Sequence, residues 1–92
     1  DAHNWFNYSQ DVAETISFRN SSIQGVFFII AARMLGLDCG PMSGFDQNGV
    51  DKEFFPNTNI KSNFLCNIGY GDSKSLFERS PRFKFDEVCE IL

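Results

Sequence analysis

Residues 11–35 have the sequence DVAETISFRNSSIQGVFFIIAARML, which contains no proline and a single glycine, Gly25. Its apolar side chains recur at intervals of three, four and seven residues, the spacing of one face of a helix. Ser9 is a suitable N-cap, and Asp11 lies near the positive end of the helix dipole. Gly36 suits the left-handed backbone that follows a last helical turn. These features predict one long helix over residues 11–35.

The second half of this predicted helix is apolar on every face. Seven apolar residues follow one another without interruption from Val26 to Ala32. A helix that is apolar all round is buried on all sides, whereas a surface helix keeps one polar face. A chain of 92 residues buries a smaller share of its surface than a full enzyme domain does. We therefore expect a long buried helix whose cover comes from other sequence or a second subunit.

The segment after this helix is rich in small residues. Glycine and proline in residues 37–46 predict an irregular loop. Asp46 can cap a short helix that runs to about Phe54, and Pro56 starts the next turn.

Residues 60–70 alternate in their centre, with Phe64, Cys66 and Ile68 on one side, which predicts a strand. A polar irregular stretch over 71–82 and a short helix over 85–92 complete the pattern. Helix, loop, helix, strand and helix in one pass predict a single α+β unit over residues 1–92.

Composition excludes several classes of protein. A net charge of −4 does not suit a nucleic-acid partner, which requires clustered lysine and arginine. The longest apolar run is far below the ~20 residues that span a bilayer, so no membrane segment is expected. The three cysteines are odd in number and widely spaced, which excludes a disulfide framework and a close-spaced zinc pair. A reducing cytoplasm is the simplest location.

No catalytic or metal-ligating set emerges from the side chains. His3 is the only histidine and stands near the first residue, which argues against histidine acid–base chemistry and against zinc sites of the HExxH type. Acidic residues Asp86, Glu87 and Glu90 lie in the first turns of a predicted helix, where they complement its dipole. Cys66 and Cys89 lie in apolar patterns typical of inert buried cysteine.

Two features are candidates for ligand binding. The Gly40-Pro41-Met42-Ser43-Gly44 segment lets the backbone approach a ligand closely and leaves N–H groups free around Ser43 and Gly44. That arrangement suits a flat heteroaromatic ring with acceptor atoms on its edge, although composition alone favours a plain connector. Arg79-Ser80-Pro81-Arg82 places two guanidinium groups near a stiff turn, which suits a phosphate, and its alternative is a solvated basic loop.

The order and content of three segments resemble the nitroreductase family. They are residues 35–46, 50–55 and 61–72, and the segments 18–22 and 79–82 belong to the same pattern. The match is nearest to the branch named malonic semialdehyde reductase, or NADH dehydrogenase/NAD(P)H nitroreductase, of pyrimidine degradation. Members are about twice as long, so the chain resembles their C-terminal half. The resemblance implies an FMN-dependent nitroreductase-like fold of α/β/α layers, with NADH or NADPH as co-substrate and a small-molecule electron acceptor.

The resemblance also implies roles for particular residues. The family's Pro-x-x-Gly loop corresponds to Pro41, Met42, Ser43 and Gly44, and its backbone lies against the flavin ring. The family's C-terminal basic pair corresponds to Arg79 and Arg82, which would bind the FMN phosphate. Members are homodimers with FMN at the interface, and their N-terminal half supplies the rest of the site. The alternatives are a non-enzymatic helical dimerisation module and an inactive fragment that lacks half of the flavin site.

Overall fold

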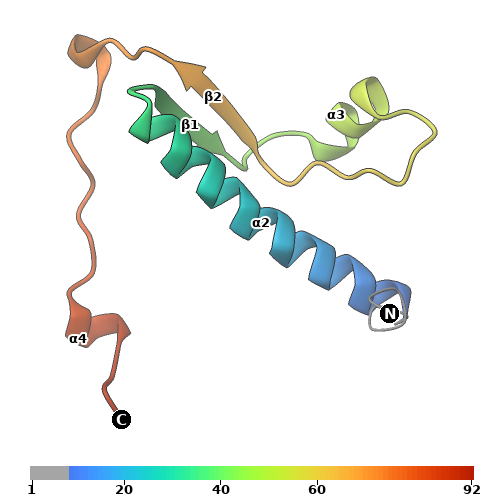
Figure 1. The fold of residues 1–92 in the computed structure, drawn as a ribbon, viewed down its shortest axis with the longest axis horizontal. Coiled ribbons are helices and arrows are strands. Elements are labelled where there is room, and N and C mark those ends of the chain that lie inside the picture. The colour runs from blue at the N-terminus through green and yellow to red at the C-terminus, as the bar shows by residue number, and fades with distance from the viewer. Residues whose placement is uncertain (1–8) are drawn as a thin grey trace.

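The computed structural model describes residues 9–92, so His3 lies outside the described residues. Its elements in chain order are α2 (Gln10–Met34), β1 (Asp38–Met42), α3 (Gln47–Phe54), β2 (Leu65–Gly69), the 3-10 turn η1 (Ser73–Ser75) and α4 (Phe85–Val88) (Figure 1). This content confirms the α+β class. The described residues form one long helix beside a two-stranded sheet, and the α/β/α layering stays a prediction.

The long helix has the ends that its sequence predicts. The Ser9 side chain accepts a hydrogen bond from the N–H of Val12 at 3.4 Å and thereby caps the first turn. At the other end Gly36 has a φ of 85°. The N–H of Gly36 donates to the carbonyl of Arg33, and that of Leu37 donates to the carbonyl of Ala32, both at 3.0 Å. These two bonds form a Schellman motif, which needs the left-handed glycine.

The predicted loop at 37–46 is partly wrong, because residues 38–42 form strand β1. It pairs antiparallel with β2, from Asp38 opposite Gly69 to Met42 opposite Leu65. An antiparallel ladder uses the N–H groups of alternate residues only, so Pro41 can occupy a position between them in a strand with a single neighbour. The local sequence signals an irregular segment, and pairing with a strand 25 residues away overrides it.

Strand β2 is shorter than the predicted strand over 60–70. Residues 60–64 bond to helices instead: the N–H of Ser62 donates to Asp51 Oδ1 at 2.8 Å. Asn63 Nδ2 donates to Ser22 Oγ at 3.0 Å. Its neighbour Phe64 lays its ring against Gly25 of α2, so close that a Cβ built on that glycine would lie 2.5 Å from the ring. β1 has ended by this point, so these residues have no strand to pair with.

The predicted terminal helix over 85–92 is also too long. The helix ends after Val88, and Cys89 has an extended backbone with φ −132° and ψ 152°. Ile91, which the pattern placed on the apolar face, is 85% exposed. A single helical turn needs a surface to pack against, and the described chain offers it none. Cys89 is likewise exposed rather than buried as predicted.

The chain encloses very little core. Among residues 9–92, Ala32 is the only buried hydrophobic residue, and Phe27 of the apolar run is 67% exposed. The radius of gyration is 17.6 Å, whereas a compact chain of this length has about 12 Å. The accessible surface is 8718 Å², against ~5,400 Å² for a folded monomer of this mass. The predicted burial of α2 is therefore not achieved within this chain.

Candidate functional site

The predicted ring-facing segment straddles the end of β1. Pro41 and Met42 are the last residues of the strand, and Ser43 and Gly44 follow it. Within residues 9–92 the N–H groups of Ser43 and Gly44 donate to no acceptor, while the Ser43 carbonyl accepts from Phe45 at 3.1 Å. A Cβ built on Gly44 would meet no atom within 4 Å. The segment thus presents two adjacent free donors beside open space, which suits a ligand with acceptor atoms on its edge.

Both sides of this segment are anchored. Met42 pairs with Leu65 in the sheet. On the other side, Asp46 Oδ1 accepts from the N–H of Gly49 at 3.1 Å and caps α3. Only residues 43–46 span the gap between strand and helix, so the direction of their N–H groups is set by two fixed ends. Such prepositioned donors lose little freedom when a ligand binds.

A carboxylate that sequence reasoning missed fixes the opposite end of β1. Asp38 Oδ2 accepts from the N–H of Gly71 at 2.7 Å, and Asp38 Oδ1 forms an ion pair with Arg33 Nη1. The same Arg33 nitrogen donates to the carbonyl of Leu37 at 3.2 Å. These contacts join the end of α2, the start of β1 and the residue after Tyr70. The signal in the sequence is an acidic residue just past the helix end, five positions after an arginine.

The predicted phosphate-binding arginines lie on an exposed stretch. Arg82 Nη1 donates to the carbonyls of Ser80 at 2.8 Å and Pro81 at 3.4 Å, so one nitrogen of its guanidinium is engaged by backbone of the same turn. Arg79 makes no hydrogen bond or ion pair within residues 9–92. Its guanidinium and the remaining N–H groups of Arg82 face solvent, where they can bind a phosphate.

One copy of the chain does not bring these arginines to the Ser43–Gly44 segment. The register places Met42 and Leu65 at one end of the ladder and Asp38 and Gly69 at the other. Residues 70–92 leave from the Asp38 end and run away from the sheet, with the loop at the far end of β1 (Figure 1). A ligand that touches both therefore needs a second copy of the chain or a different course of residues 70–92.

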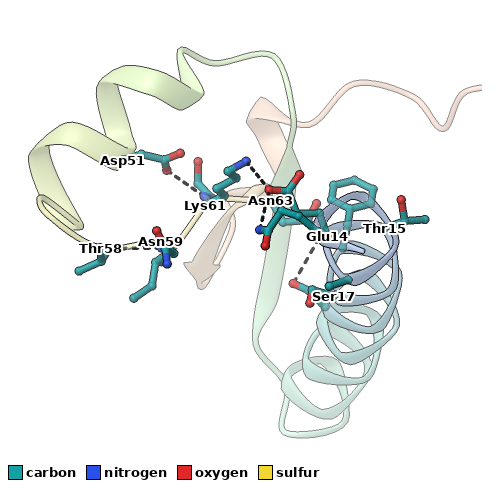
Figure 2. A pocket seen from close by; sticks show the side chains of 14 residues that line it. Glu14, Thr15, Ser17, Asp51, Thr58, Asn59, Lys61 and Asn63 are labelled. Atoms are coloured by element: carbon teal, nitrogen blue, oxygen red, sulfur yellow. Dashed lines mark hydrogen bonds and ion pairs between the residues drawn. The ribbon is translucent and has the colours of Figure 1, made fainter. Parts of the chain in front are cut away.

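A cleft lies elsewhere in the described residues, between the first half of α2 and residues 58–63. It has a volume of about 1140 Å³, and none of the six predicted cofactor-binding residues lines it. Figure 2 shows Lys61 reaching across to Glu14, with the two charged atoms 3.2 Å apart. Hydrogen bonds from Gln10 and then from Lys61 lower the pKa of Glu14. Because these polar groups bind one another, we interpret this region as a seam, the contact that holds residues 58–63 on α2, rather than as a ligand site.

We also searched the described part of the chain for a metal site and for a helix that could cross a membrane. Residues 9–92 contain no group of three or more histidine, cysteine or acidic side chains that could hold a metal ion. No helix among them is both long and apolar enough to cross a membrane. The single histidine, His3, lies outside this part.

No protein-family model matches the sequence. Two curated proteins, both named "Putative NADH dehydrogenase/NAD(P)H nitroreductase", do match. The one from Burkholderia lata is 58% identical over 91 residues, 99% of this chain and 47% of its own length. The one from Polynucleobacter asymbioticus is 56% identical over 92 residues, the whole of this chain and 47% of its own length. The chain thus spans about half the length of these relatives. These matches confirm that the chain is, over its whole length, a homologue of proteins named NAD(P)H nitroreductases.

Proposed function

We propose that the protein containing this chain is an FMN-dependent NAD(P)H oxidoreductase of the nitroreductase type. The observation that carries the proposal is the identity of 56–58% over the whole chain with proteins named for NAD(P)H-linked reduction. The free N–H groups at the end of β1 support it, because they suit the acceptor-rich edge of a flavin. Bound FMN would accept a hydride from NADH or NADPH and pass two electrons to a second substrate.

The role of this chain is to hold and polarise the cofactor. The Ser43 or Gly44 N–H would donate to an acceptor atom on the ring edge, where a fixed donor stabilises negative charge without having to reorganise. Pro41 and Met42 set the position of these donors at the end of the strand. Arg79 and Arg82 would bind the phosphate, for which a planar guanidinium is well shaped. No side chain of the chain is proposed to react.

We propose that a homodimer, together with the rest of the relatives' length, completes the site. In one copy the Ser43–Gly44 loop lies at one end of the hairpin and the arginines follow its other end (Figure 1), so the two meet only if a second copy supplies the arginines or residues 70–92 take a different course. The chain exposes ~3,300 Å² more than a compact monomer of its mass. That excess is about four times the ~800 Å² per partner of a standard interface, so it leaves room for more than one such contact.

For the second substrate we propose malonic semialdehyde, reduced to 3-hydroxypropionate in the cytoplasm as part of pyrimidine degradation. This substrate is supported by the resemblance of the sequence to the malonic semialdehyde reductase branch of the family. Nitro compounds, quinones and enones are the competing acceptors, and turnover assays of the full-length protein with each of these four classes under NADH and under NADPH would rank them.

The direct test is the visible spectrum of the purified full-length protein. We expect flavin absorbance near about 450 nm that NADH or NADPH bleaches without oxygen and that the electron acceptor restores. A colourless protein that takes up no added FMN would overturn the enzyme proposal. It would favour the alternative in which the exposed apolar helix serves only dimerisation.

A further inference from the structure

Two cysteines lie diagonally across the hairpin. Cys39 of β1 is opposite Ile68, and Cys66 of β2 is opposite Pro41. Side chains of paired residues point to the same face, and so do residues two apart on one strand. The register therefore places both thiols on one face of the sheet as diagonal neighbours.

This face is turned towards α2. Phe64, two residues before Cys66, continues the same face and lays its ring against Gly25 of the helix. Cys39 and Cys66 are both half-buried, whereas Cys89, just after α4, is exposed. The two strand thiols are thus partly sheltered and remain within reach of small molecules.

The two thiols interact with each other. Partial burial raises the pKa of Cys39, and the charge and hydrogen bond of the Cys66 thiol raise it further. The Cys66 thiol also donates to the carbonyl of Asn67 at 3.4 Å. The diagonal register makes the two side chains neighbours on one face of the sheet, which is the first requirement for a bond between them.

The spacing of diagonal residues decides what kind of bond can form. Their Cα atoms are typically about 7–8 Å apart, whereas a disulfide usually spans ~4.4–6.8 Å. Closing the bond requires the strands to shift relative to each other by on the order of 1 Å; within residues 9–92 each of the two strands has only the other as a neighbour. The resulting disulfide would be strained, and strained disulfides are the readily reduced, reversible ones.

We propose that Cys39 and Cys66 form an oxidisable thiol pair, which hydrogen peroxide converts into a reversible disulfide between β1 and β2. Peroxide oxidises one thiolate to a sulfenic acid and leaves as hydroxide. The second thiol attacks the sulfenic sulfur, the S–S bond forms, and the sulfenic oxygen leaves with the remaining proton as water. In sum, two thiols and one peroxide give one disulfide and two waters.

The bond would act on the strand that leads into the Ser43–Gly44 segment. Cys39 precedes Pro41 by two residues, so a link to Cys66 fixes the distance between the strands at that point. The inference does not depend on the proposed flavin chemistry, since a protein that binds no FMN has the same two thiols.

The test is peptide mapping of the full-length protein after treatment with hydrogen peroxide. The thiols are then blocked with iodoacetamide, and the protein is digested with trypsin without reductant. Trypsin releases Cys39 in residues 34–52, Cys66 in 62–74 and Cys89 in the peptide that begins at residue 85. We expect a peptide joining 34–52 to 62–74 that lacks two hydrogens and that dithiothreitol separates.

Variants make the result specific. Cys66→Ser should abolish the joined peptide and leave Cys39 open to alkylation, whereas the matched control Cys89→Ser should leave the joined peptide unchanged. The proposal is overturned if peroxide yields only sulfinic or sulfonic acids on separate peptides. It is equally overturned if the joined peptide persists in Cys66→Ser or contains residues 85–92.

Discussion

The clamped region, residues 9–69, and the C-terminal arm, residues 70–92, behave as different kinds of polypeptide. The clamped region has capped helices, a paired hairpin and side-chain bonds between distant elements, such as Asn63 to Ser22. The arm has two single helical turns, and its hydrogen bonds apart from that of Gly71 to Asp38 span three or four residues at most. Phe77 on the arm is 97% exposed, whereas Ala32 in the clamped region is 5% exposed.

Both regions expose apolar side chains, but they differ in how their backbones are held. Apolar side chains at almost full exposure cost free energy in water, at roughly 25 cal/mol for each Å² left uncovered. The arm carries several of them: Leu76, Phe77, Phe83 and Ile91. The clamped region holds its backbone in place with its own bonds, and it also exposes the apolar faces of α2. We therefore expect other protein to bury apolar side chains of both regions. Only the arm lacks internal contacts that would hold its backbone in place before that.

The largest expected effect comes from isolating residues 1–92. With a single buried hydrophobic side chain among the described residues, burial offsets little of the conformational entropy that folding costs. We expect the isolated chain to show some helix by circular dichroism and no cooperative transition in urea. The full-length protein should unfold with a steep single transition, and an equally steep one in the isolated chain would show that residues 1–92 fold without further cover.

The next effect concerns the arm as a binding element. Arg82→Ala in the full-length protein should weaken FMN binding by roughly 10- to 150-fold, because a hydrogen bond to a charged group contributes about 1.5–3 kcal/mol. Fluorescence titration of the apoprotein measures it. Lys52→Ala, a change of the same charge on α3, serves as the control. Equal FMN affinities of the two variants would show that Arg82 does not bind the phosphate.

A smaller effect is expected at the junction of the two regions. Asp38→Ala removes the contacts to Arg33 and to the N–H of Gly71. Because the carboxylate is half-exposed, we expect a loss of about 1 kcal/mol in the free energy of unfolding. Urea denaturation of the full-length protein measures it. Asp86→Ala, on the arm, should change little, and equal losses in both would show that Asp38 does not join the regions.

The smallest effect is the pH dependence of the seam between α2 and residues 58–63. Gln10 and Lys61 lower the pKa of Glu14 below its ordinary value of 4.5. The ionised carboxylate therefore stabilises the folded state above that value, and its contribution is lost as the pH falls through the lowered pKa. Unfolding of Glu14→Gln should differ slightly from the parent at neutral pH and match it in strong acid. A difference for Glu14→Gln that persists in strong acid would contradict the assignment.

Local rules predicted those features that depend on neighbouring residues. The bounds of α2, the caps at Ser9 and Asp46 and the left-handed Gly36 follow from side chains within a few positions. Strand β1 was not predicted because its glycine and proline indicate a loop. What makes it a strand is its pairing with β2, which local sequence does not reveal. Asp38 was missed because its partner Gly71 lies 33 residues away. The roles of Ser43 and Arg82 come from the family resemblance, since the chain alone does not bring them together.

Hydrogen exchange of the arm, compared between the isolated chain and the full-length protein, tests most directly that the arm is shaped by contacts outside this chain. We predict that the amides of residues 76–92 exchange at nearly the rate of an unstructured peptide in the isolated chain and become protected in the full-length protein. Peptides from 38–42 and 65–69 serve as the internal reference for the paired hairpin. Equally fast exchange of the arm in both proteins would contradict the account.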